Sequence, residues 1–148
     1  MAATEKYCSL DDIKKRIPER ELIDLTDDND TGSVDTAVVD AIIISASNEI
    51  NSYCQERYAE HIPFDEASVP SLIKDLCVEL SVYKLKLRRN RVDESWEAIY
   101  DHAIKTLEKI SKGTVSLGLA KTSTIKANAI TFTNKTVDDR IFKDPQGY

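Results

Sequence analysis

Apolar residues recur at three- and four-residue spacing from Asp35 to Tyr58, the longest uninterrupted helical pattern in the chain. This repeat places them on one face of an α-helix. The apolar stripe consists of Val39, Ile42, Ile43, Ala46, Ile50, Tyr53 and Cys54. The other side is predicted to be polar and consists of Asp40, Ser47, Asn48, Asn51, Gln55 and Glu56. The pattern predicts a long central helix onto which the other elements pack.

Two short helices are predicted before the central one. Ser9 is an expected N-cap with Asp12 three residues later, a pattern resembling a capping box. Pro18 ends this first helix and suits the start of the second, which carries Leu22, Ile23 and Leu25.

Two longer helices are predicted after the central one. The first runs from Pro70 to Arg89, and its apolar stripe is Leu72, Ile73, Leu76, Cys77, Leu80, Tyr83 and Leu87. The second starts at the N-cap Asp93 and ends with Lys112 before Gly113. Its stripe is Trp96, Ile99, Tyr100, Ala103, Ile104, Leu107 and Ile110. The chain is therefore predicted to be all-α, a small antiparallel bundle around one long helix.

The pattern changes at Gly113, because Thr, Ser, Asn and Lys dominate the rest of the chain. We expect a helical body over residues 1–112 and an extended C-terminal arm over residues 113–148. The arm has too few apolar residues to offset an ordering entropy of ~1–2 kcal/mol per residue by itself. We therefore expect it to contact another subunit or a partner protein, although folding back onto its own helices is the alternative. The expected anchors are Ile130, Phe132, Arg140, Phe142 and Tyr148.

Charge divides the chain in the same place. The 148 residues have a net charge of −6, and residues 113–148 hold five basic and three acidic side chains. The first 112 residues therefore carry −8, which should repel nucleic acid.

The chain has no apolar run of the ~20 residues that span a bilayer, and its start does not resemble a signal peptide. We expect a protein made in the cytoplasm with no membrane contact.

The dense basic cluster at Arg88, Arg89 and Arg91 is the candidate binding site of the body. It lies at the end of a predicted helix and lacks interleaved aromatic residues. Compensation of the helix dipole together with contact to an acidic neighbour is the favoured interpretation, and a DNA-binding or regulatory role is the alternative. A contact with a protein partner is also expected at this cluster.

The acidic loop from Thr26 to Gly32 partly matches the sequence pattern of a calcium-binding EF-hand. Asp27, Asn29 and Gly32 fit that pattern, but Val38 stands where a bidentate Glu is required. We therefore interpret the loop as a solvated turn. A metal enzyme using Asp27, Asp28 and Asp30 is a minor alternative, because no second ligand cluster is evident.

The remaining candidate chemistry is limited. Cys8, Cys54 and Cys77 lack metal-ligand or redox spacing and are interpreted as small hydrophobic residues. The spacing of the other residues indicates no nucleophile elbow, phosphate loop or paired metal ligands. The sequence therefore predicts no enzyme, cofactor or metal.

Several short segments occur in a familiar order over roughly residues 7–118. They are YCSLDD at Tyr7–Asp12, LIDLTDD at Leu22–Asp28, the helix entry at Gly32–Asp35, the spacing of Ala46, Glu49, Ile50 and Tyr53 before Arg57 and Tyr58, and that of Leu107, Ile110, Lys112 and Gly113. Together they resemble the Mu-like phage family of small head-to-tail connector, or head-completion, proteins. The closing Arg140–Phe142 and Gly147–Tyr148 resemble the short C-terminal signature of this family, whereas Asp144 and Pro145 depart from it.

This resemblance implies a structural protein of the virion neck. It implies an adaptor that docks below the portal protein as a closed homo-oligomeric ring on the order of twelve copies. Such a ring would form part of the DNA channel and present a surface to the next neck or tail-completion protein. Duplex DNA would pass through it without sequence-specific binding.

Overall fold

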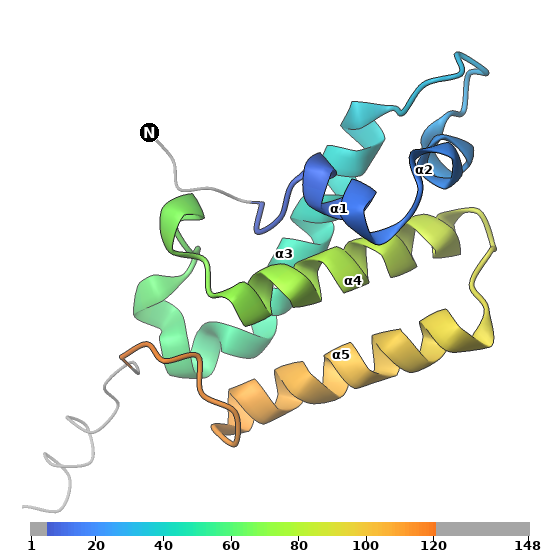
Figure 1. Ribbon diagram of the computed structural model, residues 1–148. Helices are drawn as coiled ribbons and strands as arrows, with labels where there is room; N and C mark the ends of the chain where they lie inside the picture. Colours follow the sequence, from blue (N-terminus) through green and yellow to red (C-terminus); the bar gives the residue numbers. More distant parts are fainter. Residues whose placement is uncertain (1–5, 121–148) are drawn as a thin grey trace, which may run out of the picture.

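The computed structural model describes residues 6–120, which fold into five α-helices and two short 3-10 turns (Figure 1). The helices are α1 (Leu10–Arg16), α2 (Glu19–Thr26), α3 (Thr36–Tyr58), α4 (Ser71–Arg88) and α5 (Glu94–Lys112). The turns η1 (Ala59–His61) and η2 (Glu66–Ser68) lie in the connection between α3 and α4. Since this part of the chain contains no strand, the all-α prediction is confirmed.

Local capping sets most of the helix boundaries where the sequence predicted them. Ser9 and Asp12 form a reciprocal capping box at the start of α1. Asp35 accepts hydrogen bonds from the first backbone N–H groups of α3, and Asp93 accepts from the N–H of Trp96 at 2.9 Å. Gly113 ends α5 in the left-handed conformation, with φ 86°.

Helices α3 and α4 form the centre of the bundle, and each contacts all four other helices. Figure 1 shows α4 between α5 on one side and α1 and α2 on the other. Glu49 of α3 contacts Tyr100 of α5, and Arg57 further along α3 reaches the end of α5 at Lys112. Helices α3 and α5 therefore run parallel, with α4 antiparallel to both. The predicted central helix is confirmed, and α4 is equally central.

The core combines the apolar faces of all five helices. Its fully buried large side chains are Ile13, Leu22, Leu25, Ile43, Ile50, Tyr58, Phe64, Ile73, Leu80, Leu85, Leu107 and Ile110, with Phe64 contributed by the α3–α4 connection. Burying an aliphatic side chain of this size contributes ~1.5–3 kcal/mol, so this contiguous cluster drives the fold. The predicted stripe of α5 is buried or partly buried throughout.

Two predicted positions are wrong. Ser47, expected on the polar side of α3, is buried and accepts a hydrogen bond from the backbone N–H of Tyr7 at 3.1 Å. The reason is that the segment before α1 covers that side of α3. Leu87, expected on the buried stripe of α4, is 56% exposed, because no described residue covers the last turn of α4 on that side. Val78, Val82 and Leu85 are buried instead, since four helices surround α4.

The chain continues along the body after α5. Val115, Leu117 and Leu119 are partly buried against the core. The Leu117 N–H donates to the Tyr58 hydroxyl at 3.2 Å, and His61 Nε2 contacts the Ala120 carbonyl oxygen at 2.8 Å. The first residues of the predicted arm, 113–120, therefore pack on their own subunit.

Candidate interaction site

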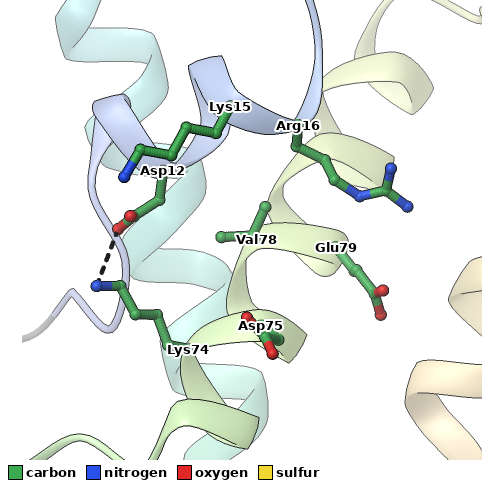
Figure 2. A pocket seen from close by; sticks show the side chains of 7 residues that line it. All are labelled: Asp12, Lys15, Arg16, Lys74, Asp75, Val78 and Glu79. Carbon is green, nitrogen blue, oxygen red and sulfur yellow. Dashed lines mark ion pairs between the residues drawn. The ribbon is translucent and has the colours of Figure 1, made fainter.

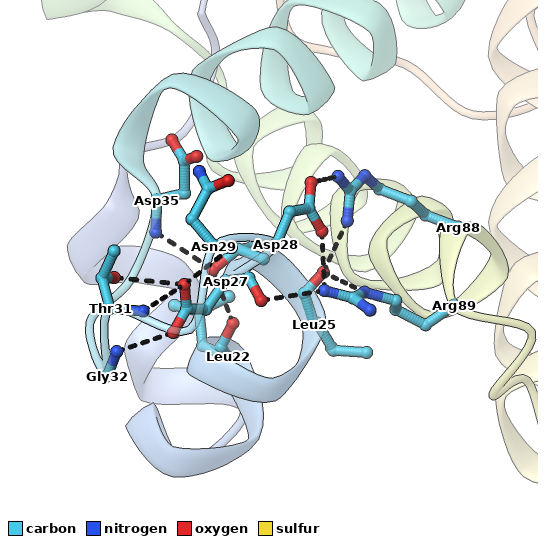
Figure 3. A network of polar contacts seen from close by, with 11 residues as sticks. Leu22, Leu25, Asp27, Asp28, Asn29, Thr31, Gly32, Asp35, Arg88 and Arg89 are labelled. Carbon is cyan, nitrogen blue, oxygen red and sulfur yellow. Dashed lines mark hydrogen bonds and ion pairs between the residues drawn. The ribbon is translucent and has the colours of Figure 1, made fainter.

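The loop between α2 and α3 is built around the carboxylate of Asp27 (Figure 3). This carboxylate accepts hydrogen bonds from the N–H groups of Thr31 at 2.9 Å and Gly32 at 2.7 Å. These donors hold the pKa of Asp27 below its usual value. The interpretation of the loop as a turn whose side chains satisfy local backbone donors is thereby confirmed.

Thr26 joins the two ends of this loop. Its buried hydroxyl donates to the Leu22 carbonyl oxygen at 2.9 Å and accepts from the Asp35 N–H at 3.1 Å. One side chain thus connects the last turn of α2 to the N-cap of α3.

Arg88 and Arg89 lie against the C-terminal end of α2, and both form ion pairs with Asp28 (Figure 3). Arg89 Nη2 is 2.6 Å from Asp28 Oδ1, and the hydrogen bond from Arg88 is the main reason that the pKa of Asp28 is lowered. Arg88 also donates to the Leu25 carbonyl oxygen at 3.0 Å, and Arg89 to that of Asp27 at 3.1 Å. The two guanidinium groups satisfy carbonyl groups that a helix end leaves unpaired. The predicted contact of this cluster with an acidic neighbour is therefore confirmed.

The predicted partner-binding residues have different placements. Arg88 and Arg89 are brought together on Asp28. Arg91 is exposed, and its side chain forms no hydrogen bond or ion pair within residues 6–120. The anchors expected on the arm, Ile130, Phe132, Arg140, Phe142 and Tyr148, lie outside the described residues.

An open pocket of about 330 Å³ lies between α1 and α4 (Figure 2). Its lining residues are Asp12, Lys15, Arg16, Lys74, Asp75, Val78 and Glu79. The three cations and three carboxylates balance each other, and one pair, Lys74 and Asp12, is 3.6 Å apart. Partial burial raises the pKa of Glu79. A pocket of this mixed charge suits a polar protein segment better than a polyanion.

The ring of Trp96 at the start of α5 contacts two cations. Lys86 Nζ is 5.6 Å and the Arg16 guanidinium 5.0 Å from its ring centre, which is cation–π range. Lys86 is buried and forms an ion pair with Glu21 of α2. These contacts join α1, α2, α4 and α5. Sequence patterns did not predict them, because most of the partners are far apart along the chain.

A cluster of tyrosines lies where α3, α4 and α5 meet at the surface. Tyr83 and Tyr100 stack with their ring centres 4.1 Å apart. Glu49 contacts the Tyr100 hydroxyl at 3.4 Å and Lys84 Nζ at 3.0 Å. Both rings stay partly exposed. Since tyrosine is enriched at protein interfaces, this cluster is a candidate contact surface that the stripe pattern alone did not indicate.

Many of the charged groups described above hold helices together through ion pairs, caps and turns. Within residues 6–120, no helix is long and apolar enough to cross a membrane.

The known proteins that this chain resembles are proteins of Mu-like bacteriophages. The chain is 33% identical over 88 residues to the "Mu-like prophage FluMu protein gp36" of Haemophilus influenzae, and this match covers 60% of the chain and 58% of that relative. A family model described as "Bacteriophage Mu, Gp36" matches residues 7–134. Because that match covers most of the chain, the chain belongs to the bacteriophage Mu Gp36 family. The predicted membership of a Mu-like phage family is confirmed.

Proposed function

We propose that this protein is a structural component of the virion neck that connects head to tail. In this role it docks below the portal protein as a homo-oligomeric ring of about twelve copies and presents a surface to the next neck or tail-completion protein. The observation that carries the proposal is the phage family match, which extends from residue 7 to residue 134. The role is structural, without enzymatic activity.

The charge of the body supports this role. Residues 113–120 carry no charged side chain, so residues 1–120 keep the net charge of −8. Each Lys or Arg that pairs with phosphate adds salt-dependent affinity, and a DNA conduit must keep such pairs few. Arg88 and Arg89, the densest cations of the body, are already engaged by Asp28. Duplex DNA can therefore pass the body without tight binding.

The C-terminal residues supply a second part of the proposal. Their aromatic and aliphatic residues are spaced along a polar sequence, and burying one such side chain contributes ~1.5–3 kcal/mol. We assign Ile130, Phe132, Arg140, Phe142 and Tyr148 to contacts with a neighbouring subunit or the portal. Hydrogen exchange of the monomer and the assembly tests this assignment. Protection of residues 121–148 should appear only on assembly, and equal protection in the monomer would place the contacts within one subunit.

The ring is tested by the mass and shape of the assembly. The purified protein would be examined by native mass spectrometry and electron-microscope class averages, alone and with the portal protein of the same phage. A closed ring, formed alone or on the portal, is expected. A chain that stays monomeric and does not bind the portal contradicts the proposal.

The DNA-binding alternative is tested by titration with duplex DNA at two salt concentrations. The expected result is weak binding that does not depend on Arg91. Micromolar binding with a steep salt dependence that is lost in Arg91→Ala would support the alternative. Glu94→Ala, which removes a nearby exposed charge of the opposite sign, is the matched control.

A further inference from the structure

Three apolar side chains form an exposed surface where α4 and α5 meet. Tyr83 and Leu87 lie one turn apart on the same face of α4, and the Tyr83 ring stacks on that of Tyr100 in α5. Both tyrosines are partly exposed, and Leu87 is the one large apolar side chain within residues 6–120 that is mainly exposed, at 56%. Aromatic side chains are enriched in protein interfaces, so this Tyr83–Leu87 surface suits an apolar side chain of a partner.

The edge of this surface on α5 carries unpaired negative charge. Glu97 lies three residues before Tyr100 on the same side of α5, and it is exposed and forms no ion pair within residues 6–120. Glu94 and Asp101 are exposed as well, and residues 94–104 contain no Lys or Arg. A partner that brings apolar side chains between positive charges is therefore favoured at this surface.

A segment of the same chain, beyond the described residues, has this chemistry. Residues 121–137 contain no acidic residue and three lysines, Lys121, Lys126 and Lys135. The lysines flank Ile130 and Phe132 in the sequence. The family match ends at residue 134, so it includes these two apolar residues and stops before the other expected anchors. Ile130 and Phe132 are therefore the anchors whose surroundings match the Tyr83–Leu87 surface.

The place where the described chain ends favours the surface of a neighbouring subunit. Ala120 contacts His61 in η1, at the opposite end of the bundle from Leu87 (Figure 1). The length of α5, ~28 Å for 19 residues at 1.5 Å per residue, separates the two ends. The ten residues from Ala120 to Ile130 span at most ~33–36 Å, so reaching Leu87 of the same subunit requires nearly full extension back along the bundle. A neighbour in a ring is not subject to this constraint.

We propose that Ile130 and Phe132 of one subunit dock on the Tyr83–Leu87 surface of the next subunit in the ring. The flanking lysines then lie beside the carboxylates at the start of α5. This inference rests on the proposed ring and adds the place where the C-terminal segment binds. The contact joins two different surfaces, so it repeats from subunit to subunit until the ring closes.

The experiment introduces a photo-crosslinking residue at the second anchor of the full-length chain, as Phe132→benzoylphenylalanine. Isotope-labelled and unlabelled subunits are mixed equally and assembled, alone or on the portal protein of the same phage. After illumination and proteolysis, mass spectrometry identifies the linked peptides. Links from position 132 to the peptides that contain Leu87 or Tyr100 are expected, and pairs of one labelled with one unlabelled peptide show that the link joins two subunits.

Two variants with an added charge make the test specific. Leu87→Glu is expected to abolish the link, because a carboxylate would be buried against an apolar anchor and beside the acidic residues of α5. Leu87 is exposed, so the helical circular dichroism of this variant should be unchanged. Ser71→Glu is the matched control, because it adds the same charge at an exposed position at the other end of α4, and it should keep the link.

The charge of the segment is tested separately. Replacement of the three lysines by glutamine should lower the yield of the link, and the loss should be larger at low salt than at high salt.

The results that overturn the inference differ from those that overturn the neck role. A ring in which position 132 links elsewhere, or links only within one subunit, overturns the inference and leaves the neck role in place. A link that persists in Leu87→Glu, or a yield that is unchanged in the lysine variant, does the same. Absence of a ring both alone and on the portal protein overturns the two proposals together, and the native mass of the assembly separates this case from the others.

Discussion

The guanidinium group of Arg57 occupies the space that a side chain on Gly113 would need. Arg57 reaches this position because Nη2 donates to the Lys112 carbonyl oxygen at 3.1 Å. Gly113 also adopts φ 86°, which side-chain-bearing residues rarely adopt. Two independent constraints therefore require glycine at the end of α5.

Replacing Gly113 by Ala should cost more stability than replacing Gly118 by Ala. Gly118 has a similar φ of 75°, but no atom lies within 4 Å of the position of an added Cβ. Gly118→Ala should lower the free energy of unfolding by about 1 kcal/mol through backbone strain alone. Gly113→Ala should lose about 1 kcal/mol more, because Arg57 must leave its carbonyl partner. Urea titrations measure the free energy of unfolding of each variant. In an Arg57→Ala background, Gly113→Ala and Gly118→Ala should lower this free energy by equal amounts.

Leu85 and Leu87 should respond very differently to truncation, although they are two residues apart on α4. Leu85 is fully buried, and Leu85→Ala should lower the free energy of unfolding by about 2–5 kcal/mol. Leu87 is 56% exposed, so Leu87→Ala should change it by less than about 0.5 kcal/mol. Denaturant melts of Leu85→Ala and Leu87→Ala measure the two changes in the free energy of unfolding. A large loss in Leu87→Ala would mean that the stripe predicted from the sequence describes the folded state better.

Removing the Tyr7 hydroxyl should destabilise the fold. This hydroxyl donates to Asn51 Oδ1 and accepts the buried N–H of Phe64 at 3.1 Å. Tyr7→Phe leaves both groups without their partner and should cost about 1–3 kcal/mol. Tyr83→Phe is the control, because the Tyr83 hydroxyl forms no hydrogen bond within residues 6–120. Equal thermal stability of the two variants would show that the Tyr7 contacts are not needed.

Stability should fall in acid, with Asp28 contributing. The hydrogen bond from Arg88 lowers the pKa of Asp28 in the folded protein below its unfolded value of 3.8. The contribution of Asp28 to folding stability is therefore present above its pKa in the unfolded protein. It is lost as the pH falls through its pKa in the folded protein. Asp28→Asn should lower the melting temperature at neutral pH and reduce its dependence on pH below about 4. Added salt should reduce the difference between variant and wild type at neutral pH, because the pair is exposed.

Truncation tests the division between body and arm. A chain ending after Ala120 should keep the helical circular dichroism and the melting temperature of the full chain. A chain ending after Lys112 also loses Val115, Leu117 and Leu119, which pack on the core, and should melt at a lower temperature with its helices retained. Failure of the shorter chain to fold would refute the prediction that residues 1–112 carry the fold.

The sequence predicted the features that depend on neighbouring residues. The caps at Ser9 and Asp93 and the stop at Gly113 involve groups within a few positions, so the sequence displays them directly. Helix α5 was predicted well because only one of its faces is buried. Helices α3 and α4 are covered on several sides, so a single stripe misplaced Ser47. Leu87 was misplaced because no residue within 6–120 covers the last turn of α4 on its side.

The candidate site was less predictable because its contacts join distant positions. The basic cluster was predicted to meet an acidic neighbour, but nothing in the sequence identifies Asp28, sixty positions from Arg88. The contact of the Arg16 guanidinium with the Trp96 ring depends on how α1 and α5 pack beside α4. Both are consequences of tertiary packing, which short-range patterns do not encode.

The parallel arrangement of α3 and α5 gives the molecule an electrical polarity. Each long helix carries roughly half a negative elementary charge at its carboxyl end, and two of the three such ends, at Tyr58 and Lys112, lie together. Arg57 lies in the last turn of α3, and Lys109 and Lys112 lie in the last turn of α5, so three cations meet two half-charges. This end of the bundle therefore compensates its helix dipoles with its own side chains and needs no cation from a partner.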